Sequence, residues 1–238
     1  MNLLYSFESF ILDCLFPVFC YGCGQEGLWL CRICQEKLLK TSPTCIVCKK
    51  ITFSDSTHVL GVTCRSCKNH TSIHRFYSPF SYQDPLIRLM IHDIKYARLT
   101  SLIPELSHAV FKALSYFRVT FPSDAIFIPI PMHRRRKNHR GFNQSALLAK
   151  VLASLFGALY NEDILIKPKP TLPQVGLSLE NRLTNLQGSF EVKDKAEVRG
   201  KCVVLVDDVK TTGSTLEIAA RVLKEAGARE IIAITIAH

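Results

Sequence analysis

Apolar segments of two kinds alternate along most of the chain. Short runs rich in β-branched residues predict strands that are buried on both faces of a parallel sheet, at 125–130, 201–206 and 230–237. Longer segments with apolar residues at helical spacing predict helices at 85–92, about 101–117, 144–156 and 215–225. Because strand and helix alternate, we expect an α/β domain with a parallel sheet flanked by helices.

The first 70 residues have a different pattern. Apolar side chains at helical spacing predict an amphipathic helix at 3–19, ended by Pro17, which packs on the rest of the chain. A composition shift after Cys67 and a polar stretch at 68–75 predict a boundary between a module at 1–70 and a domain at 71–238. No apolar run reaches the roughly 20 residues that cross a bilayer, so we expect no membrane span.

Ten cysteines are present, and nine of them lie within the first 67 residues. Eight form four Cys-x-x-Cys pairs: Cys20 and Cys23, Cys31 and Cys34, Cys45 and Cys48, Cys64 and Cys67. Two residues between ligands let one tight turn direct both sulfurs at a metal, and four thiolates complete a tetrahedral zinc site. Eight thiolates therefore predict two structural zinc ions. Sequential pairing of neighbouring pairs closes the shortest loops, while interleaved pairing stays open.

Composition indicates the cellular compartment of the protein and the class of its binding partners. No secretory signal fits the first residues, which carry Glu8 and Asp13 and lack a basic start. We therefore expect the protein to lie in the cytoplasm. Thiols stay reduced in that compartment, so Cys-x-x-Cys pairs there are typical of metal binding. Hydrophobic residues make up 47% of the 238 residues, enough for a sizeable core, and Cys14 and Cys202 are expected inside it. The net charge of +10 favours anionic partners, either nucleic acid or phosphorylated small molecules.

The segment after the predicted strand at 201–206 carries the most specific chemistry. It is predicted to be a strand-to-helix loop, made of Asp207, Asp208, Val209, Lys210, Thr211, Thr212 and Gly213, with Ser214 or Thr215 opening the helix. Small residues at a helix N-terminus let backbone N–H groups approach a phosphate. Two carboxylates would repel that phosphate, but they can accept hydrogen bonds from vicinal hydroxyls or hold a metal ion. Together these groups predict a site for ribose 5-phosphate.

These residues resemble the phosphoribosyl pyrophosphate (PRPP) signature of the type I phosphoribosyltransferases. The resemblance implies that Asp207 and Asp208 contact the ribose hydroxyls and Mg²⁺, and that residues 211–215 hold the 5-phosphate. Val209 and Lys210 complete the PRPP-binding segment.

A second polar segment follows the predicted strand at 125–130. Arg134, Arg135, Arg136 and Lys137 form a basic loop that would hold pyrophosphate or a nucleic-acid backbone, or would simply be solvated. After it, Gly141 and Asn143 are expected to be turn and N-cap residues that fix Arg140 and Gln144.

The Arg140-Gly-Phe-Asn-Gln144 motif, together with the cysteine module, resembles the ComF family of ComFC/GntX type. In that pattern Lys95 and Tyr96 belong to a short pyrophosphate-binding loop, in which members often have a glycine where this chain has Arg98. Gln174 and Arg182 match a mobile catalytic loop, where Arg182 would neutralise departing pyrophosphate. The resemblance implies a role in natural transformation, acting on incoming single-stranded DNA.

Two functions remain open from sequence. The first is a phosphoribosyltransferase with an unknown acceptor, in which Asp207, Asp208, Lys95 and Arg182 act on PRPP and Mg²⁺. The second is a non-catalytic scaffold or sensor that binds single-stranded DNA or a competence helicase. Tyr21, Trp29, Tyr82 and Phe142 could then stack on bases, although isolated aromatic residues are more often core.

Overall fold

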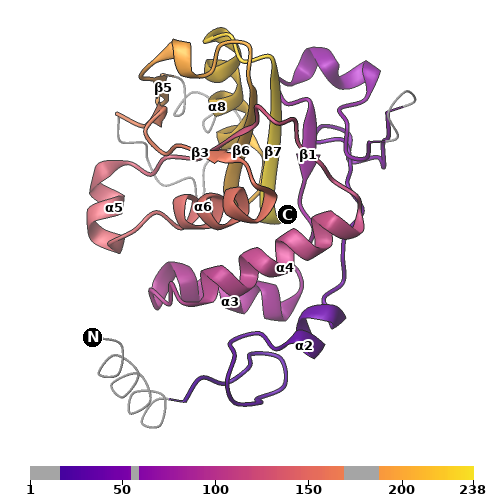
Figure 1. The fold of residues 1–238 in the computed structure, drawn as a ribbon, viewed down its shortest axis with the longest axis vertical. Helices are drawn as coiled ribbons and strands as arrows, with labels where there is room; N and C mark the ends of the chain where they lie inside the picture. The colour runs from indigo at the N-terminus through magenta and orange to yellow at the C-terminus, as the bar shows by residue number, and fades with distance from the viewer. Residues whose placement is uncertain (1–16, 55–58, 169–187) are drawn as a thin grey trace.

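The computed structural model describes residues 17–54, 59–168 and 188–238. A parallel sheet with the strand order β1-β7-β6-β2-β3 forms its centre, and β4 and β5 form a separate antiparallel pair (Figure 1). The strands are β1 (Arg75–Tyr77), β2 (Ile126–Pro129), β3 (Leu159–Tyr160), β4 (Leu165–Ile166), β5 (Glu191–Val192), β6 (Cys202–Val209) and β7 (Glu230–Ala237). The helices are α2 (Arg32–Lys37), α3 (Pro85–Tyr96), α4 (Leu102–Tyr116), α5 (Arg134–Arg140), α6 (Gln144–Phe156) and α8 (Ser214–Glu225), with 3-10 turns η1 (Arg65–His70) and η2 (Lys195–Glu197).

Helices cover both faces of this sheet, which confirms the predicted α/β architecture. Along β6, Val204 and Val206 belong to the core shared with α3, α4 and α6, whereas Val203 and Leu205 belong to the core shared with α8. All four side chains are fully buried, as expected for a central parallel strand. The predicted burial of Cys202 is also confirmed.

Local sequence explains where the helices begin and end. Asp84 caps α3 by accepting hydrogen bonds from the backbone N–H groups of Leu86 and Ile87, and Pro85 occupies the first helical position. Asn143 caps α6 in the same way, as predicted, and Gly157 ends it with a left-handed φ of 64°.

The segment 134–140 and the end of β6 differ from the sequence prediction. The segment 134–140, predicted as a basic loop, is the short helix α5, capped by His133 and ended by Gly141 at a φ of 90°. The strand predicted to end at 206 continues to Val209, because β7 runs beside it and pairs Asp207 with Thr235 and Val209 with Ala237. Both acids therefore lie on the strand itself, and the connecting loop shortens to 210–213.

The first cysteine-rich segment is docked on α3 and α4. The Glu105 carboxylate on α4 accepts hydrogen bonds from the backbone N–H groups of Trp29, at 3.1 Å, and of Leu30. The Tyr21 hydroxyl donates to Asp93 on α3 at 2.6 Å. Tyr21 and Trp29 also pack against the main core, and so does Phe142. These three aromatic side chains therefore contribute to packing.

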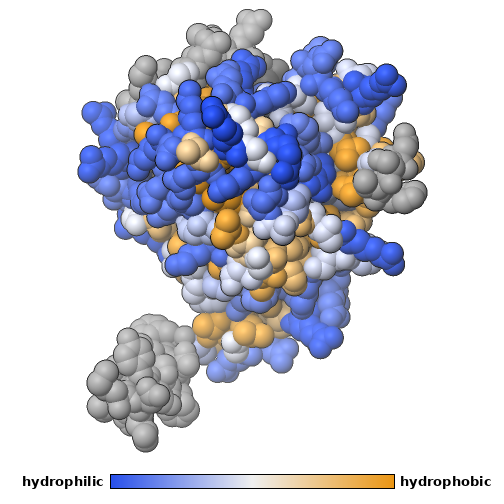
Figure 2. Space-filling view, turned by 45° about the horizontal axis from the view of Figure 1, so that its top comes forward, coloured by the Kyte–Doolittle hydropathy of each residue, from blue (hydrophilic) through white to orange (hydrophobic). Residues whose placement is uncertain are grey.

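Hydrophilic residues cover most of the face shown in Figure 2, with smaller hydrophobic areas between them. Among the described residues, no helix combines the length and the apolar character needed to cross a bilayer.

Candidate functional site

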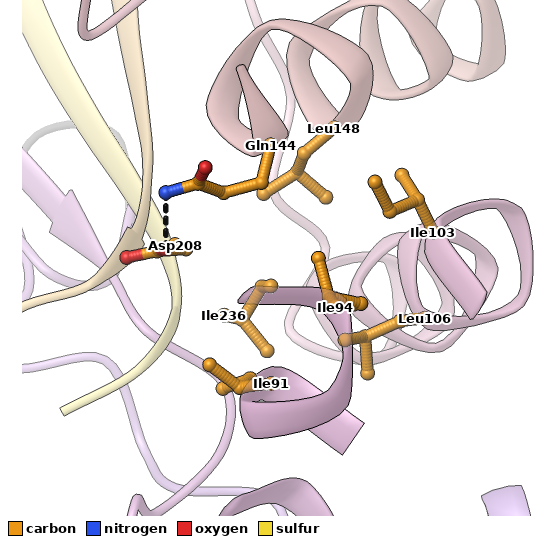
Figure 3. Close-up of a pocket in the computed structure, with 8 residues that line it drawn as sticks. All are labelled: Ile91, Ile94, Ile103, Leu106, Gln144, Leu148, Asp208 and Ile236. Carbon is orange, nitrogen blue, oxygen red and sulfur yellow. Dashed lines mark hydrogen bonds between the residues drawn. The ribbon is translucent and has the colours of Figure 1, made fainter. Parts of the chain in front are cut away.

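Side chains from two helices meet at the carboxyl end of β6. The Oδ2 atom of Asp208 accepts a hydrogen bond from Gln144 Nε2 at 2.7 Å, and it lies 2.9 Å from Lys95 Nζ (Figure 3 shows the Gln144 bond). Gln144 is the first residue of α6, and Lys95 lies in the last turn of α3. The fold therefore brings together Lys95 and Asp208, two of the residues that sequence singled out as catalytic.

Asp207 has a different environment. Its Oδ1 atom accepts hydrogen bonds at 2.9 Å from Ser145 Oγ and from the backbone N–H of Asp208. Burial and the neighbouring charge of Asp208 raise the pKa of Asp207 to about 7, against the opposing effect of these bonds. Asp207 therefore changes its charge near neutral pH.

The short loop after β6 has the geometry of an anion cradle. Gly213 adopts a left-handed φ of 85°, and Ser214 begins α8 directly behind it. Thr212 Oγ1 and Ser214 Oγ lie 3.0 Å apart, and Thr211 and Thr212 are exposed to solvent. The positive end of the α8 helix dipole favours an anion at this position.

Lys210 lies beneath this loop. Its side chain is buried, and its Nζ atom lies 5.4 Å from the centroid of the Phe76 ring. A Cβ atom on Gly213 would lie 3.1 Å from Lys210 Cε, so the loop and the lysine stem are closely packed. Burial and the nearby charge of Lys49 lower the pKa of Lys210.

Lys95 and Tyr96 do not form a loop, which corrects the expectation from the family pattern. They are the last two residues of α3, whose helical pattern extends beyond the predicted end at residue 92. Tyr96 is 69% exposed, and the centroid of its ring lies 4.7 Å from that of His92. The turn after them is tight, because Arg98 adopts a left-handed φ of 58° and donates to His139 O at 2.8 Å. A glycine would adopt this conformation without steric cost.

The basic residues divide into two groups. Arg140 Nη1 donates to Gln144 Oε1 at 2.8 Å, so Arg140 is connected to Asp208 through Gln144. The side chains of Arg134, Arg135, Arg136 and Lys137 are exposed on α5. Arg140 is thus part of the site around the acids, whereas 134–137 form a solvent-facing cationic surface next to it.

Sequence reasoning missed Lys167, Ser145 and the direct role of Gln144. Lys167 follows β4; its Nζ lies 5.2 Å from the centroid of the Phe190 ring. Burial and the positive charge of Arg136 lower the pKa of Lys167 to about 8, although the negative charge of Asp207 opposes this shift. No motif surrounds Lys167, so nothing in the sequence singles it out. Gln174 and Arg182 lie outside the described residues.

A small cavity adjoins Asp208 on the helical side. It has a volume of about 10 Å³, close to the least that holds one water molecule. Isoleucine and leucine side chains of α3, α4, α6 and β7 line it beside Gln144 and Asp208 (Figure 3). This apolar wall keeps water away from one side of Asp208.

The eight predicted cysteine ligands form two groups of four. Cys20, Cys23, Cys31 and Cys34 form one, and Cys45, Cys48, Cys64 and Cys67 form the other; within each group the sulfur atoms lie within 4.8 Å of one another. This confirms the sequential pairing. Burial opposes ionisation of Cys20, but hydrogen bonds from backbone N–H groups lower its pKa to about 6. Hydrogen bonds from Ser66 and Cys67 lower the pKa of Cys64 to about 6.

The donor set of each group fits a structural zinc ion, because four thiolates at this separation satisfy tetrahedral coordination. Gly22 provides the space that the first group needs. A Cβ atom at Gly22 would lie 2.7 Å from Cys34 Sγ, so any larger residue would displace a ligand.

Comparison with known proteins places these features in a family. Residues 144–238 match the family described as phosphoribosyl transferase domain. The DNA utilization protein YhgH of Escherichia coli O157:H7 is 30% identical over 90% of this chain and 94% of its own length. Competence protein F of Haemophilus influenzae is 31% identical over 85% of this chain and 87% of its own.

The chain belongs to the ComF family. Competence protein ComFC of Bacillus subtilis is a further relative, 27% identical over 83% of this chain and 79% of its own. In this ComF-family chain, the matched residues include Gln144, both acids and the loop 210–213. Lys95 and the cysteine groups, which fit a double zinc ribbon, precede them.

Proposed function

We propose that this ComF-family protein binds PRPP together with Mg²⁺ at the carboxyl end of β6. The observation that carries the proposal is the juxtaposition of two acids on one strand with a small-residue loop at the N-terminus of α8. Asp207 and Asp208 would accept hydrogen bonds from the ribose hydroxyls, and residues 209–215 would enclose the 5-phosphate. Lys95 and Arg140 would contact the pyrophosphate, together with Gln174 and Arg182 from outside the described residues.

Transfer from PRPP requires little covalent chemistry from the protein. Pyrophosphate leaves ribose C1 while positive charge grows on the sugar, so positioning and charge stabilisation dominate. Two carboxylates fit a Mg²⁺ ion that takes its other oxygen ligands from substrate and water, and bound Mg²⁺ would neutralise the leaving group. Lys95 and Arg140 would add fixed positive charge on the same side of the ribose.

The test of binding is a calorimetric titration of PRPP with Mg²⁺ into the zinc-loaded protein. We expect one saturable site per chain, and the absence of heat and of competition by ribose 5-phosphate would contradict the proposal. Release of pyrophosphate in the presence of candidate acceptors, including single-stranded DNA, then separates the two functions. An enzyme turns over, whereas a scaffold or sensor binds PRPP without consuming it.

We further propose that single-stranded DNA is the macromolecular partner. Support comes from the exposed cationic surface of 134–137 beside the site and from the competence and DNA utilization names of the relatives. A helicase partner and a cytoplasmic location stay predictions.

Salt dependence tests the cationic surface. Each phosphate contact releases counterions, so DNA affinity should fall steeply as salt rises. In the Arg134→Ala/Arg135→Ala/Arg136→Ala variant, we expect the slope of log K against log salt to become shallower by about 2 units, as about three contacts are lost. The exposed Lys150→Ala variant serves as a control. An unchanged slope and affinity in the triple variant would show that DNA binds elsewhere.

The pKa of Asp207 predicts a pH dependence of ligand binding. Protonation below pH 7 removes the charge that the ribose hydroxyls and Mg²⁺ require, so affinity should rise by about tenfold between pH 6 and pH 8. Ser145→Ala removes a hydrogen bond that favours the charged carboxylate, so the midpoint should move to higher pH. The measurement is the dissociation constant of PRPP across this range.

Ser107→Ala is the matched control, because its hydroxyl bonds only to Ile103 O within α4. Titration of the ligand phosphate affects all three proteins equally. If Ser145→Ala keeps the wild-type midpoint, Asp207 is not the titrating group.

A further inference from the structure

The ion pair between Lys95 and Asp208 occupies the position at which the proposed ligand would bind. Their side chains are only 22% and 10% exposed, and Nζ lies 2.9 Å from Oδ2. Gln144 Nε2 donates to the same oxygen at 2.7 Å. Without a ligand, this carboxylate oxygen already has a cationic partner and a neutral hydrogen-bond donor.

The ion pair weakens the attraction between Asp208 and a free metal ion. A divalent cation is attracted to Asp208 only as far as its charge is unbalanced, and Lys95 balances it at contact distance. Among the described residues, the only groups of three or more metal-binding side chains are the two cysteine groups. The two acids therefore offer Mg²⁺ neither a full ligand set nor an unpaired charge on Asp208.

A ligand with a pyrophosphate group changes this balance. It brings anionic oxygens that attract the ammonium group of Lys95, and it supplies oxygen ligands that complete the shell of a metal ion. Lys95 lies in the last turn of α3 and has a flexible four-carbon side chain. Its Nζ atom can therefore exchange one anion for another while the helix stays in place.

We propose that Lys95 is the resident counter-ion of Asp208, and that it holds the metal position closed until a ligand with pyrophosphate exchanges with it. The divalent cation then enters with the ligand and not before it. This inference rests on the proposed PRPP function for its second half, whereas the competition between Lys95 and a metal ion can be measured alone.

The experiment titrates Mn²⁺ alone into the zinc-loaded full chain and follows free Mn²⁺ by electron paramagnetic resonance. Mn²⁺ favours oxygen ligands and does not replace zinc in thiolate sites. We expect Lys95→Met to bind Mn²⁺ at least about tenfold more tightly than the wild type, because removal of one balancing charge exposes Asp208. Lys150→Met, on the exposed face of α6, should match the wild type.

The Lys95→Gln variant is a second test that should retain the fold, because it keeps a hydrogen-bond donor and removes only the charge. It should also tighten Mn²⁺ binding, and its PRPP affinity should fall while its affinity for ribose 5-phosphate is maintained. Mn²⁺ affinities of both variants equal to the wild type would overturn the inference. If Mn²⁺ binding tightens but the wild type does not bind PRPP, the proposed function fails and the counter-ion role stands.

Discussion

Loss of the first cysteine group is expected to unfold the N-terminal part of the chain and to lower the stability of the whole protein. A structural zinc ion contributes about 10–16 kcal/mol to the folding of small zinc modules. Between 17 and 54 the only regular element is α2, which has six residues, so this segment has little hydrogen-bonded structure to replace the metal. Cys20, Cys31 and Cys34 also lie in the same core as α3 and α4, so the damage should spread to the helix that carries Lys95.

The measurement compares Cys31→Ser/Cys34→Ser with the wild type by metal analysis and by thermal unfolding. We expect the metal content to fall from two zinc ions per chain to one, with a decrease in Tm of more than about 10 °C. Cys202→Ala is the matched control, because it removes a buried cysteine outside both groups and should retain both metal ions. A double variant that keeps two zinc ions would show that these sulfurs are not the ligands.

A side chain at position 213 is expected to abolish phosphate binding. Gly213→Val forces a β-branched residue into a left-handed conformation and places its Cβ against the stem of Lys210. The loop can relieve this strain only by leaving the geometry that directs its N–H groups at the ligand. We expect PRPP affinity to fall by about 100-fold or more, equivalent to about 2.7 kcal/mol.

The Gly157→Val variant distinguishes the effect of backbone strain from the effect of a changed ligand-binding loop. Gly157 also has a positive φ, of 64°, at the end of α6, but a Cβ atom there would meet no atom of a neighbouring segment within 4 Å. Both variants should lose about 1–2 kcal/mol of unfolding free energy, and only Gly213→Val should lose PRPP binding. Equal PRPP affinity in the two variants would exclude the loop as the phosphate site.

Sequence predicted those parts of the fold that depend on local pattern. The runs that became β6 and β7 are apolar on both faces, and α6 has a capping asparagine and a terminal glycine. The type of all three elements, and the bounds of β7 and α6, are therefore visible in the residues themselves. The helix α5 was missed because its residues 134–140 are all polar and present no apolar stripe. The extension of β6 to Val209 was missed because it depends on its neighbour β7.

The candidate site was predicted where its residues form one continuous motif. The two acids and the loop 210–213 are consecutive, whereas Lys95 and Gln144 are brought to Asp208 by long-range packing that no spacing reveals. The Lys95–Asp208 ion pair in particular joins the last turn of α3 to the end of β6. The division into 1–70 and 71–238 stays a prediction, as do the roles of Gln174 and Arg182.

If the acids of β6 hold the ribose of PRPP, removal of their charge should abolish binding of the ligand. Calorimetric titration of PRPP with Mg²⁺ compares the wild type, Asp207→Asn/Asp208→Asn, and Asp163→Asn, whose side chain is 81% exposed and outside the site. We predict saturable binding to the wild type and to Asp163→Asn, and none to the double variant with its fold intact. Undiminished binding to the double variant would contradict the claim.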